Sequence, residues 1–219
     1  VLTTPSNPTG RVYDQAACQA VVEAAADHDA YVIADEVYLG LTYDGPGQGI
    51  AAYTDHPEHV LTVGSCSKTY AMTGWRLGWL AGDRHLTDEV VTIHESTTAC
   101  ASSVAQHAAI AALTGPQEPF EEMYDAFEAR RDLVVDRVAS IDGLSCPRPE
   151  GAFYAYLDPG LDEPALDVAT YLLEEHGVVL APGDGFGETT PGRLRLSFAS
   201  SPAELREGFD RIEAGLEAY

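Results

Sequence analysis

Residues 30–38, AYVIADEVY, form the stretch that decides the fold. This short apolar run is rich in β-branched residues and leads into acidic ones, a pattern typical of a buried strand that runs into a loop. The stretch at 15–29 is Ala-rich and helical in composition, and the runs HVLTVGSCSK (59–68) and WRLGWLAG (75–82) predict two more strands. Strands that alternate with helices favour an α/β layer with a mostly parallel sheet.

Asp35 and Lys68 each lie where a predicted strand ends. In open α/β sheets, ligands bind beyond the carboxyl ends of the strands. We therefore expect Asp35 and Lys68 to contribute to a ligand site.

The rest of the chain is expected to form helices and a smaller α+β region packed against the first. One helix is predicted over 84–114, where the breakers Gly115 and Pro116 end it, and another over 119–141. The remaining expected elements are strands at 151–158, 178–182 and 193–199, a helix at 167–177 and a terminal helix.

The charge balance excludes whole classes of function. The chain of 219 residues has 35 acidic and 12 basic residues, a formal net charge of −23. We do not expect a protein of this charge to bind nucleic acid through a basic face. Because the acids are spread along predicted helices, we expect a strongly hydrated surface suited to high salt, and a salt-loving source.

Membrane and metal functions are also disfavoured. No run of eighteen apolar residues is present, and the N-terminal VLTTPSNPTG lacks the layout of a signal peptide. Four scattered cysteines without a C-x-x-C pair fit reduced thiols better than a disulfide framework or a metal site. We expect a cytoplasmic protein that binds neither membranes nor metals.

Lys68 is the one lysine among the 12 basic residues, and the others are all Arg. A guanidinium cannot act as an amine nucleophile, so Arg can replace Lys only where a positive charge is enough. Lys68 is therefore a candidate for chemistry that needs an ε-amine. Coincidence in a Lys-poor composition is the simpler alternative.

Four motifs follow one another along the chain. They are Asn7-Pro8-Thr9-Gly10, Asp35-Glu36-Val37-Tyr38, Ser65-Cys66-Ser67-Lys68 with Thr73-Gly74-Trp75-Arg76, and Arg195-Leu196-Ser197-Phe198-Ala199. In order and spacing the whole chain resembles the class I/II aminotransferases, which belong to fold type I of the pyridoxal-phosphate (PLP) enzymes. The resemblance implies that residues 1–115 are the C-terminal part of the large PLP-binding domain and that residues 116–219 are the small C-terminal domain. Members of the family are nearly twice as long, so we expect an N-terminal half to be missing.

The resemblance also implies PLP as the cofactor. Lys68 would hold PLP as a Schiff base and would move a proton during catalysis. Asp35 would keep the pyridine nitrogen protonated, and Asn7 and Tyr38 would donate to the ring's 3-oxygen. The residues that match the family's phosphate ligands are Ser65, Ser67 and Arg76, with Ser65 and Arg76 the firmer pair.

Arg195 matches the family position that binds the substrate's α-carboxylate, with Asn7 beside it. Arg193 lies two residues away on the same face of the strand, so the local pattern alone leaves both open. The R-L-S-F-A match favours Arg195, and we expect Arg193 to form a surface ion pair. The segment 150–154 also resembles one near the family's substrate pocket, although its aromatic residues are equally suited to a core.

Several of these residues have simpler interpretations. Asp35 could cap a turn, but a carboxylate that ends a buried strand beside a ligand site favours the functional role. Asn7-Pro8-Thr9-Gly10 alone would be an ordinary turn. Glu36 should point away from Asp35, because successive strand residues face opposite sides. Cys66 lacks a neighbouring base, which disfavours it as a nucleophile.

The function implied is transfer of an amino group from an amino acid to a 2-oxo acid, in a ping-pong reaction and in a homodimer when the protein is complete. Aspartate, aromatic and alanine-type donors are all compatible with Arg195. A PLP-dependent C–S lyase with the same residues and a non-catalytic ligand-sensing domain are the alternatives.

Overall fold

The computed structural model describes residues 1–187 and 191–219. The chain divides into two compact units, Val1–Pro5 with Val12–Glu122 and Ser6–Arg11 with Met123–Tyr219. The predicted domain division between residues 115 and 116 stays a prediction. No helix in the described part of the chain is long and apolar enough to cross a lipid bilayer.

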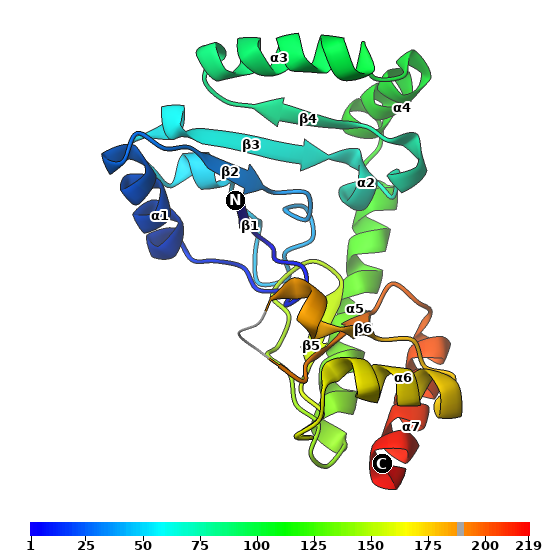
Figure 1. The fold of residues 1–219 in the computed structure, drawn as a ribbon. Coiled ribbons are helices and arrows are strands. Elements are labelled where there is room, and N and C mark those ends of the chain that lie inside the picture. The colour runs from blue at the N-terminus through cyan, green and yellow to red at the C-terminus, as the bar shows by residue number, and fades with distance from the viewer. Residues whose placement is uncertain (188–190) are drawn as a thin grey trace. The chain divides into compact units, whose positions relative to one another are not determined.

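The first unit is built on a sheet of four strands in the order β1-β2-β3-β4 (Figure 1). The strands are β1 (Leu2–Thr3), β2 (Val32–Asp35), β3 (Val60–Ser65) and β4 (Gly78–Ala81). β1, β2 and β3 run parallel, and β4 pairs antiparallel with β3. The expected α/β class with a mostly parallel sheet is confirmed.

Helix α1 (Gln15–Asp27) covers part of this sheet. It begins where the Asp14 carboxylate accepts the N–H of Ala17 at 2.7 Å, a typical N-cap. Its buried residues pack in one apolar cluster with β2 and β3, and that cluster contains Cys18, Val22, Val32, Ala34, Ile50 and Val60. This packing fixes the end of β2, where Asp35 lies.

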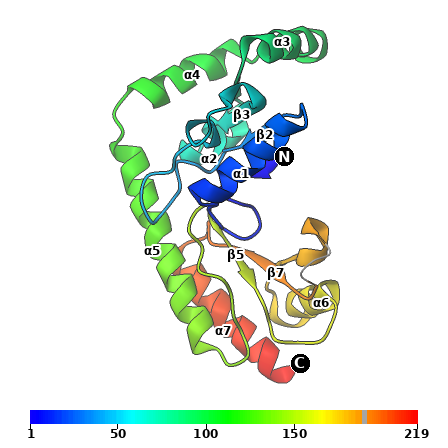
Figure 2. The ribbon, with the colours of Figure 1, turned by 90° about the vertical axis from the view of Figure 1, so that its left-hand side faces the viewer.

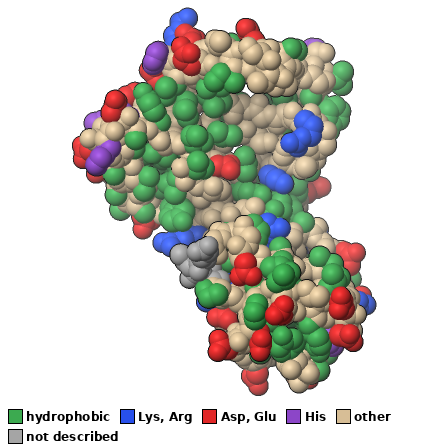
Figure 3. All heavy atoms as spheres, in the orientation of Figure 1, with side chains coloured by type: hydrophobic (Ala, Val, Ile, Leu, Met, Phe, Trp, Pro, Cys, Tyr) green, Lys and Arg blue, Asp and Glu red, His purple; other side chains and the backbone are tan. Residues whose placement is uncertain are grey.

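The remaining helices of the first unit are α2 (Cys66–Thr69), α3 (Arg84–Thr98) and α4 (Ser103–Thr114). Three short 3-10 turns lie at Ile50–Ala52, Pro57–His59 and Thr73–Trp75. Helix α3, which is fully described, buries none of its residues, and all four residues of β4 are exposed. In the face drawn in Figure 3, hydrophobic side chains cover much of this unit.

The prediction of one helix over 84–114 is wrong. Figure 2 shows two helices, α3 and α4, where one was expected. Ala99 has φ 62°, which ends α3, and Ser102 has the extended ψ of 127° that precedes α4. The Thr97 hydroxyl donates to the Ile93 carbonyl at 2.9 Å. In the last turn of α3, this side chain therefore shares a carbonyl with the backbone N–H groups of the helix, which weakens the helix there.

Helix α5 (Glu118–Ser140) begins in the first unit and continues into the second. Within the second unit, its buried side is the series Phe127, Arg131, Val134 and Val138 at helical spacing. Arg131 is 2% exposed there and pairs with Glu128 and Asp132.

The second unit holds a sheet of three antiparallel strands in the order β5-β7-β6. They are β5 (Tyr154–Leu157), β6 (Ala181–Pro182) and β7 (Leu194–Ser197), so the strand expected at 178–182 is limited to its last two residues. The helices are α6 (Ala165–His176) and α7 (Pro202–Ala218), and a 3-10 turn lies at Gly183–Phe186. Phe198 and Phe209 are fully buried in this unit's core.

Candidate active site

The end of β2 places Asp35 and Tyr38 in the first unit. Asp35 is the last residue of β2 and is half-buried, and its carboxylate accepts the N–H of Val37 at 3.4 Å. The chain then turns, because the N–H of Leu39 donates to the Glu36 carbonyl at 2.9 Å. This turn brings Tyr38 inward, where it is only 5% exposed.

Lys68 follows the neighbouring strand, β3. Because β2 and β3 are parallel and Asp35 pairs with Val63, the two strands end at the same edge of the sheet. Helix α2 begins at once after β3 and carries the half-buried Lys68, whose Nζ lies 5.8 Å from the centre of the Tyr38 ring. The expected gathering of Asp35 and Lys68 at one edge is therefore what the structure shows.

Ser65 and Ser67 begin helix α2. The Ser65 hydroxyl accepts the N–H of Ser67 at 3.0 Å and donates to the Leu77 carbonyl at 3.2 Å. It is therefore held as the cap of a short helix. The carbonyl of Ser67 accepts the Thr73 hydroxyl at 3.0 Å, which ties the helix to the turn before Arg76.

Arg76 lies in the left-handed backbone region, with φ 53° and ψ 49°. Its exposed side chain donates to the Thr73 carbonyl at 2.9 Å. Arg76 also lines an open pocket of about 590 Å³, together with residues between the end of α3 and the start of α4 such as Cys100 and Ser102. An anion in this pocket could accept hydrogen bonds from the Arg76 guanidinium, which has more N–H groups than the one that bonds to Thr73.

Cys66 is 1% exposed and packs with Met72 and Ala109. Burial raises the pKa of its thiol, which keeps it protonated. A buried, protonated thiol is a poor nucleophile, and the expectation for Cys66 stays a prediction.

In the second unit, Asn7 lies in a loop whose shape depends on Gly10. Gly10 has φ 69°, and a Cβ there would come within 2.7 Å of the Pro149 side chain. Its carbonyl accepts the N–H groups of Glu150 and Gly151 at 2.9 and 2.8 Å. The motif Asn7-Pro8-Thr9-Gly10 is therefore a turn that also fixes the segment 150–154.

Arg195 lies on the central strand β7 of the second unit and contacts Asn7. One guanidinium nitrogen donates to the Asn7 side-chain oxygen at 2.9 Å. The guanidinium carbon is 4.7 Å from the ring centres of both Tyr154 and Phe186. Stacking on aromatic rings orients a guanidinium without using all of its donors.

Arg193 has a different environment. It pairs with Asp158 at 3.0 Å, and both side chains are partly exposed. This is the surface ion pair expected for Arg193, so the guanidinium that Asn7 holds is that of Arg195.

Two features of the site escaped the sequence. Phe186, whose ring lies against Arg195, is the last residue of the glycine-rich turn Gly183–Phe186 and no motif marked it, whereas Tyr154 belongs to the segment 150–154 already singled out. Glu36 is 7% exposed and accepts the N–H of Ile50 at 2.6 Å. The one sequence signal for the Glu36 bond was the position of this acid at the end of an apolar strand, because a buried acid needs a hydrogen-bond partner.

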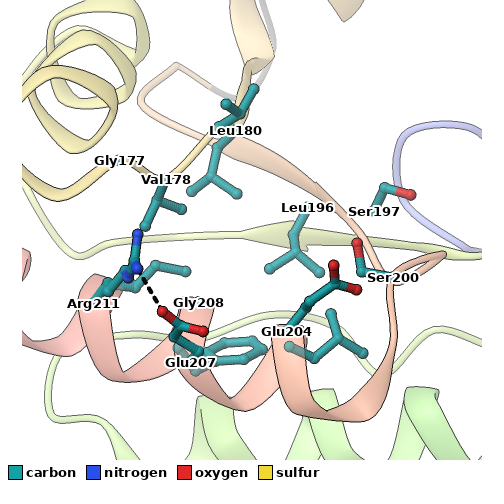
Figure 4. Close-up of a pocket in the computed structure, with 14 residues that line it drawn as sticks. Gly177, Val178, Leu180, Leu196, Ser197, Ser200, Glu204, Glu207, Gly208 and Arg211 are labelled. Carbon is teal, nitrogen blue, oxygen red and sulfur yellow. Dashed lines mark hydrogen bonds and ion pairs between the residues drawn. The ribbon is translucent and has the colours of Figure 1, made fainter.

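A further hollow of about 430 Å³ lies in the second unit between residues 177–180 and α7 (Figure 4). Its floor is apolar, with Leu180 and Leu196 among the lining residues. Its charged groups already have partners, since Arg211 pairs with Glu207 and Glu204 closes the capping box of α7. No predicted site residue lines this hollow.

The fold is an α/β sheet with Asp35 and Lys68 at one edge, and the comparisons with known proteins give its family. The sequence profile "Aminotransferase class I and II" matches residues 1–212. The chain belongs to this family.

Curated relatives agree with this assignment. The chain is 38% identical to the aspartate aminotransferase of Bacillus subtilis (strain 168) and 36% identical to the probable N-acetyl-LL-diaminopimelate aminotransferase of the same organism. The alignments cover 100% and 97% of this chain but 57% and 54% of the relatives. The chain thus spans little more than half the length of the relatives it matches.

Solved structures give the same result. The aspartate aminotransferase of Rhizobium meliloti superposes with a TM-score of 0.91 at 36% identity, over 99% of this chain and 57% of that one. The aromatic aminotransferase of Pyrococcus horikoshii OT3 superposes with a TM-score of 0.93 at 32% identity, over 99% and 59%. The fold-type I assignment is confirmed.

Proposed function

We propose that this protein is a PLP-dependent aminotransferase that moves an amino group from an amino acid to a 2-oxo acid. One observation carries the proposal. Lys68, the sole lysine, lies beside the Tyr38 ring and directly after the edge of the sheet at which Asp35 also ends its strand. An ε-amine, a carboxylate and a phenol at one sheet edge are the donor set that PLP requires.

The residues of the first unit fit PLP group by group. The Asp35 carboxylate would pair with the protonated pyridine nitrogen, and the Tyr38 hydroxyl would donate to the 3-oxygen of the ring. The phosphate would be held by hydroxyls and a bidentate cation, for which the chain offers Ser65, Ser67 and Arg76. When bound, PLP supplies an aldehyde that condenses with amines and a protonated ring that withdraws electrons from the α-carbon.

Lys68 is the group that we assign to proton transfer. An unprotonated ε-amine is a base, so Lys68 could accept the proton that leaves the substrate α-carbon and give it up again later in the transfer. An Arg at this position would remain protonated and could do neither. A carboxylate such as that of Asp35, placed against the pyridine nitrogen, would favour the protonated ring.

Arg195 is the group that we assign to the substrate carboxylate. Its fork suits two-point contact, and Asn7, Tyr154 and Phe186 fix its direction before a substrate arrives. Fixing the carboxylate orients the α-proton, and a fixed orientation lowers the entropic part of the barrier.

The donor amino acid is a proposal drawn from the relatives. Several of the most similar curated proteins carry the name aspartate aminotransferase, so aspartate is the first donor to test. Alanine and aromatic donors come next, because solved structures with those names superpose equally well. A homodimer also stays a proposal, supported by the exposed apolar residues Trp79, Val91 and Ile93 of β4 and α3.

The test is an absorption spectrum with added PLP before and after borohydride, followed by mass mapping. A band from the imine and a pyridoxyl mass on Lys68 are expected, and Lys68→Arg should show neither. The same variant controls for reaction at the N-terminal amine. A folded protein without an adduct on Lys68 would refute the proposal and favour a non-catalytic domain, while ammonia release without an oxo acid would favour a lyase.

A further inference from the structure

Glu36 is a buried carboxylate next to the candidate site, and the assigned roles make no use of it. It follows Asp35 directly and is 7% exposed, so it faces the interior. Burial raises the pKa of the Glu36 carboxyl, and the bond from Ile50 opposes that rise. A buried carboxylate destabilises a fold unless its bonds offset the loss of water, so its contacts are informative.

Glu36 is bonded at three points. Its N–H donates to the Val63 carbonyl at 2.9 Å and its carbonyl accepts the N–H of Leu39 at 2.9 Å. Its carboxylate accepts the N–H of Ile50 at 2.6 Å, fourteen residues further on. The segment 37–49 therefore leaves the sheet at Glu36 and returns to the same side chain.

Gly49, at the end of this segment, packs closely against the Glu36 side chain. A Cβ at position 49 would lie 3.0 Å from one carboxylate oxygen of Glu36 and 3.3 Å from the other. The backbone of Gly49 has φ −65° and ψ 147°, which any residue adopts readily. A side chain at position 49 would therefore press on the Glu36 carboxylate, although the backbone would accept it.

The far side of the same segment touches the helix that carries Lys68. A Cβ at Gly40 would come within 2.6 Å of the Thr69 side chain, so the backbone there lies directly against α2. Tyr38 is held inward and its carbonyl accepts the N–H of Leu41 at 2.8 Å. The Lys68 Nζ lies 5.8 Å from its ring centre.

We propose that Glu36 is a positioning residue, whose carboxylate closes the segment 37–49 through the Ile50 N–H and thereby holds Tyr38 against Lys68. The segment is anchored at its base by this bond and at its far side by α2. Without this bond, the two ends of the segment are no longer held together, and the Tyr38 ring is no longer fixed beside the Lys68 amine. The proposal rests on the proposed function for the meaning of Lys68.

The test compares Glu36→Ala and Glu36→Gln in the whole protein. Hydrogen exchange measures the amides of residues 37–50, and an absorption titration with PLP reports on Lys68. The Ala variant leaves the Ile50 N–H without an acceptor, so exchange should accelerate by roughly tenfold or more. The pH dependence of the absorption band should shift and PLP should bind more weakly.

The Gln variant keeps an oxygen in the same place without the charge, so it should restore slow exchange and the original spectrum. Gln48→Ala changes an exposed side chain of the same segment and is the matched control, expected to alter neither readout. Unchanged exchange in a folded Glu36→Ala protein would overturn the proposal. So would faster exchange with an unaltered absorption band, because Glu36 would then stabilise the segment without positioning anything.

Gly49→Ala keeps the test decisive if Glu36→Ala does not fold. The added methyl group would lie 3.0 Å from one oxygen of the Glu36 carboxylate, so the carboxylate must shift and exchange at Ile50 should accelerate. A folded Gly49→Ala protein with unchanged exchange would also overturn the proposal. Failure of the proposed function shows separately, as the absence of a Lys68 adduct in the unaltered protein.

Discussion

Asp35 and Glu36 are adjacent carboxylates with different surroundings. Asp35 is half-buried at the strand end and accepts a long 3.4 Å bond from Val37. Glu36 points to the interior and accepts a 2.6 Å bond from Ile50. Adjacent residues of a strand face opposite sides, so one carboxylate can face a ligand while its neighbour holds the scaffold.

The Glu36 pKa predicts a pH-dependent difference in stability. Burial raises this pKa in the folded protein above 4.5, the value for an unperturbed carboxyl. The folded state therefore holds the proton more firmly, and the contribution of Glu36 to the free energy of unfolding is largest below pH about 4.5 and falls as pH rises through the folded pKa. Gln carries no charge, so Glu36→Gln should gain stability relative to the unaltered protein across that window.

Urea unfolding of both proteins between pH about 4 and 8 measures this difference. Glu58→Gln removes a half-exposed acid of the first unit and controls for the change in net charge. A Glu36→Gln difference that stays constant with pH, or that follows the Glu58→Gln difference, would contradict the prediction.

At the scale of secondary-structure elements, the strands could be predicted and one helix boundary could not. β2 and β3 lie inside the apolar runs 30–38 and 59–68, because short β-branched runs bounded by polar residues leave little choice of structure. The break between α3 and α4 was missed, because residues 97–102 contain neither Gly nor Pro. A positive φ at Ala99 is a local conformation that composition does not encode.

The candidate site shows the same division. The places of Asp35 and Lys68 follow from local sequence, since parallel strands end at one edge. The Glu36 bond to Ile50 and the rings of Tyr154 and Phe186 around Arg195 depend on how distant residues pack, which no local pattern specifies. The roles assigned to the site residues stay predictions.

The start of α7 offers a test at the same scale. Ser201 caps this helix, and its hydroxyl accepts the N–H of Glu204 at 3.3 Å within a capping box. Ser201→Ala should lower the free energy of unfolding by about 1 kcal/mol, because a helix N–H loses its acceptor. Ser201→Asp retains an acceptor and is the control. Chemical denaturation measures the free energy of unfolding of both variants. Equal losses in the two would show that the hydrogen-bond acceptor at position 201 is not the cause of the loss.

At the scale of the whole molecule, the excess of acidic residues is the feature that most affects stability. The formal net charge is −23, and acidic side chains are scattered over the face drawn in Figure 3 rather than gathered in one place. Repulsion among them opposes the compact state, and salt weakens it over a Debye length that shrinks to roughly 3 Å at 1 M.

The temperature of unfolding should therefore rise with KCl concentration. Screening acts mostly below about 0.5 M salt, whereas exclusion of salt from the surface acts at molar concentrations, so the two ranges separate the causes. Circular dichroism melts across both ranges measure the effect. A melting temperature that falls or stays flat below about 0.5 M would remove the charge argument and with it the support for a salt-loving source.

The second unit is made from two stretches of chain, Ser6–Arg11 and Met123–Tyr219. The short stretch supplies Asn7 to Arg195 and the Gly10 carbonyl to residues 150 and 151. A recombination event that transferred only the long stretch would deliver Arg195 without the loop that holds it. We therefore expect substitutions at Gly10 and Pro149 to be correlated across lineages, because a side chain at position 10 would meet that of Pro149.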